Sequence, residues 1–241
     1  MIFDQAQFDI RCGWGEDGIR EFAPISDVVI IVDVLSFSTC VSIATGRGAG
    51  ILPYDGDKKG AAEFARSMGA EVAGARGRGR YSLSPATFVD IPTGALVVLP
   101  GINGARLSLL TGQVPTFVGC LRNAMAVAEA ATRVGQTIAV VPAGERCKRD
   151  GTLREAIEDC VGAGAIIRHL QGTLSSDAAA AVDLFGRVEP RLLSLLTACP
   201  SGEELISMGF EGDIPLCADV DIDNCAPVLK DGTYTVAEPV A

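Results

Sequence analysis

Short apolar runs recur along the chain and alternate with longer amphipathic stretches. The clearest run covers residues 28–32, where five consecutive β-branched side chains lead directly into Asp33. An apolar run without alternation is typical of a strand buried on both faces of a parallel sheet. Further strand-like runs lie at residues 51–54, 95–99, 114–120 and 137–141, and an edge strand is expected at 7–11.

The stretches between and after these runs predict helices and a few peripheral segments. Helices are expected at residues 40–46, 59–68, 105–110, 123–135, 152–169, 177–185, 191–197 and from 201, a strand at 213–217, and a peripheral polar tail from 227. This alternation predicts an α/β fold with three layers, α/β/α, around a largely parallel or mixed central sheet. One domain over residues 1–241 is expected, either undivided or as two subdomains with the active cleft between them.

The expected helix at residues 152–169 carries several polar signals. Thr152 followed by Glu155 matches a capping box. Glu155 and Asp159 then share a face, so either two carboxylates reach one metal ion or these acids favour the helix dipole and face solvent. Gly162 and Gly164 in the same helix indicate close packing against a neighbouring element.

Composition narrows the functional classes. A formal net charge of −10 argues against nonspecific binding to nucleic acid or to an anionic membrane, because both need a basic surface. No signal peptide or apolar run of about 18 residues is present, so a cytoplasmic protein is expected. The eight cysteines form no CxxC pair and His169 is the single histidine, which gives a Cys/His zinc site little support. The acidic, apolar-rich composition is compatible with a homodimer.

Polar residues that could bind a ligand or take part in catalysis follow the ends of several predicted strands. Ligands of open α/β sheets bind outside the carboxyl ends of strands, and Asp33 stands at such an end. The loop at residues 74–85 alternates Arg76, Arg78 and Arg80 with glycines, which favours anion binding over a solvated loop. Two later joins place an Asn and an Arg before a helix, Asn103 with Arg106 and Arg122 with Asn123. Free N–H groups there favour phosphate, although Asn is also an ordinary cap.

Taken together, these stretches resemble the 2-phosphosulfolactate phosphatase (ComB-like) family over nearly the whole chain. The family's V-I-D-V-L-R-A-S-T strand end is similar to residues 32–39, its G-E-R loop leading to N-S-P to residues 74–76 and 83–85, its T-N-G-T turn to 102–105, and its G-S-x-x-N-A to 119–124. The A-G, E-D-x-x-G-A-G, S-G-x-E-L and D-x-x-x-C-A motifs are similar to residues 143–144, 158–164, 201–205 and 213–218. The order and spacing of these motifs carry the resemblance more than any one of them.

The resemblance implies a Mg²⁺-dependent phosphatase acting on a small phosphorylated acid such as 2-phosphosulfolactate, a step towards coenzyme M. Asp33 and Asp159 are then the expected catalytic residues, and they are expected to hold the metal together with Glu145. The expected substrate-binding residues are Arg76, Ser84, Asn103, Gly104, Arg106 and Asn123.

Three positions depart from the family pattern. Ser36 stands in place of an arginine, Ala75 in place of a glutamate and Ala105 in place of a threonine. Phosphate recognition relies on arginine and metal binding on carboxylates, so each departure weakens a role that the family implies. Either Arg78, Arg80 or Arg106 compensates, or the protein acts on another phosphate ester, or it binds a small anion without turnover.

Overall fold

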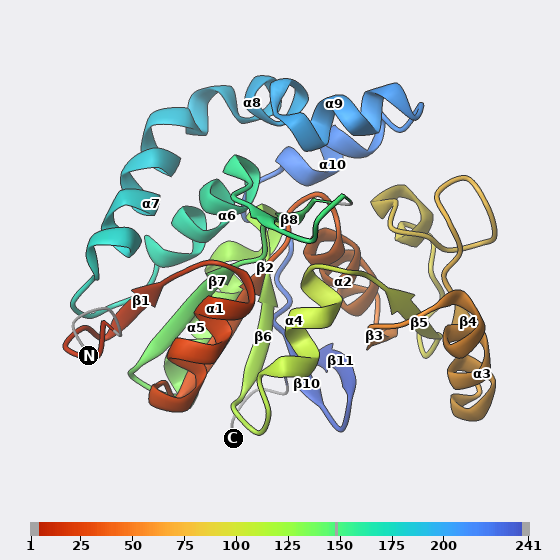
Figure 1. Cartoon of the computed structure of the whole chain (residues 1–241), viewed down its shortest axis with the longest axis horizontal. Coiled ribbons are helices and arrows are strands. Elements are labelled where there is room, and N and C mark those ends of the chain that lie inside the picture. Colours follow the sequence, from red (N-terminus) through yellow and green to blue (C-terminus); the bar gives the residue numbers. More distant parts are fainter. Residues whose placement is uncertain (1–4, 148, 238–241) are drawn as a thin grey trace.

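A nine-stranded sheet forms the centre of the computed structural model, which describes residues 5–147 and 149–237 (Figure 1). The strand order is β1-β7-β2-β6-β10-β11-β3-β5-β4. In chain order these strands are β1 (Ile10–Cys12), β2 (Val28–Val32), β3 (Gly50–Tyr54), β4 (Glu71–Val72), β5 (Leu96–Pro100), β6 (Thr116–Gly119), β7 (Ile138–Pro142), β10 (Pro227–Lys230) and β11 (Thr233–Val236). The predicted α/β fold with a mixed, mostly parallel sheet is confirmed.

Two parallel blocks make up most of the sheet. One block is β1-β7-β2-β6 and the other is β3-β5-β4, and the antiparallel hairpin β10–β11 joins them. The second block crosses the first at a steep angle in Figure 1. The carboxyl ends of β2 and β5 nevertheless meet, since the N–H of Gly104, beyond β5, donates to Asp33, beyond β2, at 2.8 Å.

Helices cover both faces of the sheet, and β2 shows why. All five of its side chains are buried, with Val28, Ile30 and Val32 packed in one core and Val29 and Ile31 in the other. The helices of the first core are α5 (Ala124–Val134), α6 (Ile157–Ile167), α7 (Ser176–Val188), α8 (Leu192–Ala198), α9 (Pro200–Ser207) and α10 (Asp213–Ala218). Those of the second are α1 (Gly15–Phe22), α2 (Phe37–Gly46) and α4 (Gly104–Leu110), while α3 (Lys58–Met68) packs on β4 and β5. The predicted three layers are therefore present.

Four short 3₁₀ segments link these elements in the described part of the chain. They are η1 (Ala23–Ile25), η2 (Pro85–Phe88), η3 (Leu121–Asn123) and η4 (Glu189–Arg191). The predicted ends of two helices at residues 46 and 68 are both confirmed. Gly69, which follows the second, has the left-handed conformation that glycine favours.

The C-terminal tail was predicted to be peripheral, and this prediction is wrong. Residues 227–236 form the hairpin β10–β11 in the middle of the sheet. Tyr234 is fully buried, and its hydroxyl donates to Ser108 at 2.8 Å. Asp231 and Gly232 both have positive φ, which fits the Asp-Gly turn of a two-residue hairpin. That dipeptide was the local signal for a strand pair.

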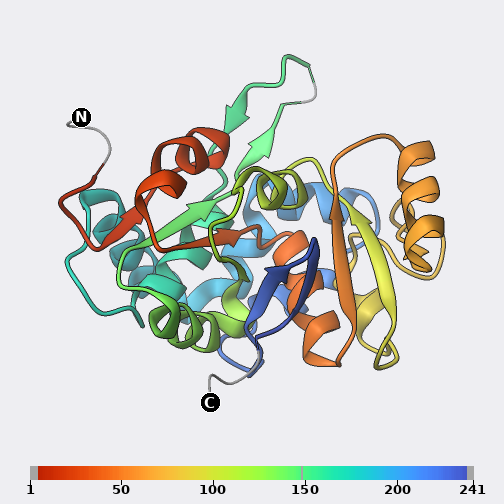
Figure 2. The same ribbon diagram turned by 90° about the horizontal axis from the view of Figure 1, so that it is seen from below.

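Two further boundaries were also predicted wrongly. Residues 213–217 lie in the helix α10, a short apolar run whose period could not separate helix from strand. The helix predicted from Thr152 begins only at Ile157, because Leu153–Arg154 (β9) pairs with Glu145–Arg146 (β8). Thr152 contacts Asp150 instead of capping a helix, and Glu155 is exposed outside α6. The β8–β9 hairpin projects from the body of the molecule (Figure 2).

The predicted close packing at Gly162 and Gly164 is confirmed. A Cβ at Gly164 would fall onto the carbonyl oxygen of Ala181 in α7, and one at Gly162 onto the side chains of Val32 and Val34. Glycine is therefore required at both positions because the neighbouring chain lies where a methyl group would be.

We predict that Gly164→Ala lowers the free energy of unfolding by about 1–3 kcal/mol, the usual cost of overpacking a core. Gly186→Ala in α7 is the matched control, because nothing lies within 4 Å of that Cβ. The control should raise stability by up to roughly 1 kcal/mol, since alanine favours a helix over glycine. Guanidinium unfolding curves measure both, and equal stability of the two variants would contradict close α6–α7 packing.

Candidate active site

A cleft of about 570 Å³ opens where β2 and β5 end. Loops after both strands line it, together with the 74–85 loop, the β8–β9 hairpin and helix α9. Its polar lining consists of Asp33, Ser36, Arg76, Asn103, Glu145, Ser201 and Glu204, and its apolar lining includes Leu35, Phe37, Leu83, Ile102, Leu205, Met208 and Phe210. Elements far apart in the sequence therefore contribute to one site.

Asp33 lines this cleft, and backbone donors hold its carboxylate. The N–H of Phe37 at the start of α2 donates to Oδ1 at 3.2 Å, and the N–H of Gly104 at the start of α4 donates to Oδ2 at 2.8 Å. A Cβ at Gly104 would fall against Phe37 and Asp33, so only glycine allows this approach. The backbone N–H of Gly104, one of the predicted substrate-binding residues, is thus engaged by Asp33.

Asp159 lies behind Asp33 and holds two loops together. Its Oδ1 accepts the N–H of Val34 at 2.8 Å, and its Oδ2 accepts the N–H of Gly144 at 2.9 Å. Only 4% of Asp159 is exposed, and it does not line the cleft. Burial raises the pKa of the Asp159 carboxyl well above its ordinary value, and the nearby charges of Asp33 and Glu158 add to this.

Burial also raises the pKa of the Asp33 carboxyl, while the two backbone N–H donors oppose that shift. The neighbouring acid Glu158 is 2% exposed, and its Oε2 has no hydrogen-bond partner in the described part of the chain. Three carboxyl groups are therefore buried side by side, an arrangement that a cation or a shared proton stabilises.

Glu145 reaches the cleft from the β8–β9 hairpin. Its Oε2 accepts the Nδ2 of Asn103 at 2.9 Å. Burial, followed by the negative charges of Asp33 and Glu204, raises the pKa of Glu145 to about 7. The hairpin is fixed beside α1, because Glu16 accepts hydrogen bonds from both Arg146 and Arg106.

Arg76 lies in the 74–85 loop and faces the acidic side chains of the cleft. Its guanidinium donates to Asp213 at 3.0 Å and to Ser36 at 3.1 Å, and it lies 5.8 Å from the ring centre of Phe210. Ser84, another predicted substrate contact, donates to the other oxygen of Asp213 at 2.6 Å and does not line the cleft. Ser84 therefore acts on Arg76 through Asp213.

Arg106 and Asn123 lie outside the lining of the cleft, although both were predicted to bind substrate. Arg106 pairs with Glu16 at 2.6 Å and with Asp55 at 2.8 Å. Asn123 is fully buried, where it accepts the N–H of Cys120 at 2.8 Å and donates to the Cys225 carbonyl at 3.3 Å. Both side chains are used in holding the fold together.

Sequence reasoning missed Asp213 and the wall formed by α9. Asp213 is 2% exposed and anchors Arg76, but the apolar run that it begins predicts a strand. Ser201, Glu204 and Leu205 lie in the stretch whose resemblance to a family motif was noted, which was the only signal available for them. Met208 and Phe210 follow that stretch and carried no signal.

The donors in the cleft fit a hard cation such as Mg²⁺. Oxygen atoms of Asp33 and Glu145 line it, and Asn103 Oδ1 is buried without a hydrogen-bond partner among residues 5–147 and 149–237. Mg²⁺ takes one or two carboxylates and keeps several waters. Within the same ranges, no three Asp, Glu, His or Cys side chains are grouped as a metal cage.

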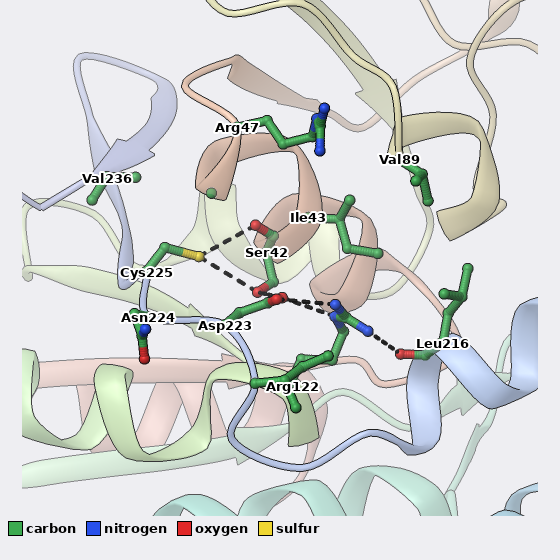
Figure 3. A pocket seen from close by; sticks show the side chains of 12 residues that line it. Ser42, Ile43, Arg47, Val89, Arg122, Leu216, Asp223, Asn224, Cys225 and Val236 are labelled. Atoms are coloured by element: carbon green, nitrogen blue, oxygen red, sulfur yellow. Dashed lines mark hydrogen bonds and ion pairs between the residues drawn. The ribbon is translucent and has the colours of Figure 1, made fainter.

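A second pocket of about 520 Å³ lies beside α2 (Figure 3). One of the arginines that line it is held by contacts within the fold. Arg122 on its wall donates twice to Asp223, at 2.8 and 2.9 Å, and once to the Leu216 carbonyl at 2.8 Å. These contacts use the guanidinium to fix the 219–225 loop. At this helix start the guanidinium of Arg122 is therefore engaged within the fold by an internal ion pair.

Fold and cleft together define an α/β protein with a carboxylate- and arginine-lined site, the chemistry expected of a phosphate-ester hydrolase. A family model described as 2-phosphosulpholactate phosphatase matches residues 17–232. The chain belongs to this phosphatase family, which confirms the resemblance seen in the sequence.

Individual relatives agree. The 2-phosphosulfolactate phosphatase of Methanothermobacter thermautotrophicus is 33% identical over 221 residues, which cover 89% of this chain and 92% of the relative. That of Methanocaldococcus jannaschii is 27% identical over 198 residues, covering 78% and 82%. The probable 2-phosphosulfolactate phosphatase of Symbiobacterium thermophilum is 25% identical over 226 residues, covering 88% and 94%.

Two of the three departures from the family pattern line the cleft. Ser36 and Ala75 face it, whereas Ala105 is fully buried in the first turn of α4. Ser36 accepts a hydrogen bond from Arg76, so one arginine lines the cleft where the resemblance implies two.

No helix in the described ranges is long and apolar enough to cross a bilayer.

We predict that stability of the metal-free protein depends on pH through Glu145. Its folded pKa of about 7 lies above the ordinary 4.5, so the folded state holds this proton more tightly than the unfolded state. The stabilising contribution is complete below pH 4.5 and is lost as pH rises through 7. Glu145→Gln should therefore gain stability relative to wild type across this window when unfolding is measured in EDTA. A constant difference between the two curves would contradict the raised pKa.

Proposed function

We propose that this protein is a Mg²⁺-dependent phosphatase that hydrolyses the phosphate monoester of a small acid such as 2-phosphosulfolactate. The observation that carries the proposal is the cleft itself, where Asp33 and Glu145 face Arg76 at the meeting point of β2 and β5. The names of the relatives support the substrate class. The proposal includes a single domain, a cytoplasmic location and a homodimer.

Asp33 and Glu145 would hold the metal, with Asn103 Oδ1 beside them. Bound Mg²⁺ polarises a phosphoryl oxygen and lowers the pKa of a coordinated water. The backbone donors on Asp33 keep its carboxylate oriented. Asp159 would support the site indirectly, because it fixes the backbone of Val34 and Gly144 at the two edges of the site.

Arg76 would bind the phosphate. A guanidinium has five N–H donors, and the described structure uses one on Asp213 and one on Ser36. The remaining N–H groups are available to phosphate oxygens, which favour arginine as a fork-shaped partner. Phe37 and Phe210 limit water around these contacts, which strengthens them.

We predict that Asp33→Asn lowers kcat by at least about 100-fold, the typical effect of removing one preorganised electrostatic group. Asp57→Asn is the matched control, because it makes the same chemical change at an exposed helix cap where Asn caps equally well. The measurement is phosphate release from 2-phosphosulfolactate, phospholactate and phosphoglycolate with Mg²⁺ and then with EDTA. EDTA should abolish release, and release that survives both EDTA and Asp33→Asn would overturn the proposal.

The alternative, anion binding without turnover, is tested by the same panel. It is motivated by Ser36 and Ala75, which replace charged residues of the family pattern at the cleft. Binding of inorganic phosphate measured by calorimetry, with no release from any ester, would favour it. Absence of both binding and release would reject the two functions together.

A further inference from the structure

The pocket beside α2 that Figure 3 shows is separate from the cleft. Among the described residues none lines both spaces, and they lie towards opposite ends of α2. Phe37, its first residue, lines the cleft, and Gly46, its last, lines the pocket. A volume of about 520 Å³ is enough for a small organic molecule. An occupant of this pocket would therefore not be the substrate that the cleft holds.

Apolar side chains from distant parts of the sequence meet at this pocket. Val89 follows η2, Ile222 lies in the 219–225 loop and Val236 ends β11. Their exposed fractions are 39%, 53% and 42%, so each has apolar area that a ligand could cover. Ile43 of α2 adds a buried apolar side chain to the same lining. An apolar body placed there removes this area from water, which favours binding.

Arg47 is the charged side chain of the pocket that the fold leaves unused. Its backbone is fixed at the C-terminal end of α2, where its carbonyl accepts the hydroxyl of Thr93 at 2.9 Å. Its guanidinium makes no hydrogen bond or ion pair in the described part of the chain. In Figure 3 no dashed line leaves this group, whereas Arg122 is joined to Asp223 and Leu216. The N–H donors of Arg47 are therefore available to an anion beside the apolar side chains.

The other charges of the lining compensate one another. The carboxylate of Asp223 accepts hydrogen bonds from Arg122 on both oxygens, at 2.8 and 2.9 Å, and from the hydroxyl of Ser42 at 2.9 Å. Asp219, which also pairs with Arg122, lies outside the lining. Among the described residues that line the pocket, Arg47 is thus the charge without a partner, in a protein whose net charge is −10.

We propose that this pocket is a second ligand site, and that it takes a small carboxylate with an apolar body. The carboxylate pairs with Arg47, and the apolar body packs against Ile43, Val89 and Ile222. The inference does not depend on the proposed phosphatase activity, because the pocket and the cleft share no described residue.

The test is calorimetric binding of 2-naphthoate and of its neutral analogue 2-naphthamide to the whole chain. Wild type should bind the carboxylate more tightly than the amide. Arg47→Gln should weaken binding of the carboxylate about threefold to fivefold, the size of one exposed ion pair, and leave binding of the amide unchanged. Ile222→Ser should weaken binding of both compounds by the same factor, because it removes apolar area and no charge.

Arg133→Gln and Ile25→Ser are the matched controls, and both should bind the two compounds as wild type does. Arg133 is an exposed arginine in the last turn of α5, Ile25 is an exposed isoleucine of η1, and neither lines the pocket. Equal effects of Arg47→Gln and Arg133→Gln, no preference of wild type for the carboxylate, or no binding of either compound would overturn the site. Loss of 2-naphthoate binding in Arg76→Gln would place the compound in the cleft and would overturn the site as well.

Discussion

The carboxylate of Asp33, held by the N–H groups of Phe37 and Gly104, is the interaction on which the site depends. It joins the ends of two strands from separate parallel blocks of the sheet, and Asp159 joins the loop after β2 to the loop after β7 in the same way. The two buried carboxylates thus fix the loops after β2, β5 and β7 relative to one another. Without them, side-chain packing alone would have to hold these three loops in place. The consequence is electrostatic, because burying these groups together raises the pKa of both carboxyls. A cation in the cleft would relieve that cost, so the interaction that shapes the site also favours a metal there.

Local signals predicted the part of this arrangement that depends on strand ends. The run at 28–32 indicated a strand buried on both faces, and the two cores divide its side chains as such a strand requires. Asp33 followed from the rule that ligands bind beyond the carboxyl ends of strands. Asn103, at a join between a strand and a helix, and Glu145, expected from the family resemblance, line the same cleft. Each of these residues lies within a few positions of a strand, where sequence and position in the fold are closely linked.

Residues that reach the site through distant contacts could not be found in this way. Asp213 is 137 positions from its partner Arg76, and no local period marks such a pair. Where β8 and β9 form a hairpin, the sequence predicts a turn and the start of a helix, because Thr152 and Glu155 imitate a capping box. The pairing of β8 with β9 and the Glu16 contact to Arg146 outweigh that weak local preference. The buried tail shows the same effect, since β10 and β11 are stabilised by strands more than 100 residues away.

Arg76 and Arg122 show why an arginine near a helix or a glycine-rich loop is an incomplete signal for phosphate. Both are largely buried, and both pair with aspartates. Arg122 donates through Nε and both terminal nitrogens to Asp223, Asp219 and the Leu216 carbonyl, which leaves little of its fork for a ligand. Arg76 donates through its two terminal nitrogens once each and faces a cleft. The difference lies in how many N–H groups the fold itself consumes, a quantity that depends on partners 40 to 137 positions away along the chain. The number of unused donors, more than the presence of an arginine, therefore separates an arginine that is free to bind a ligand from one that the fold consumes.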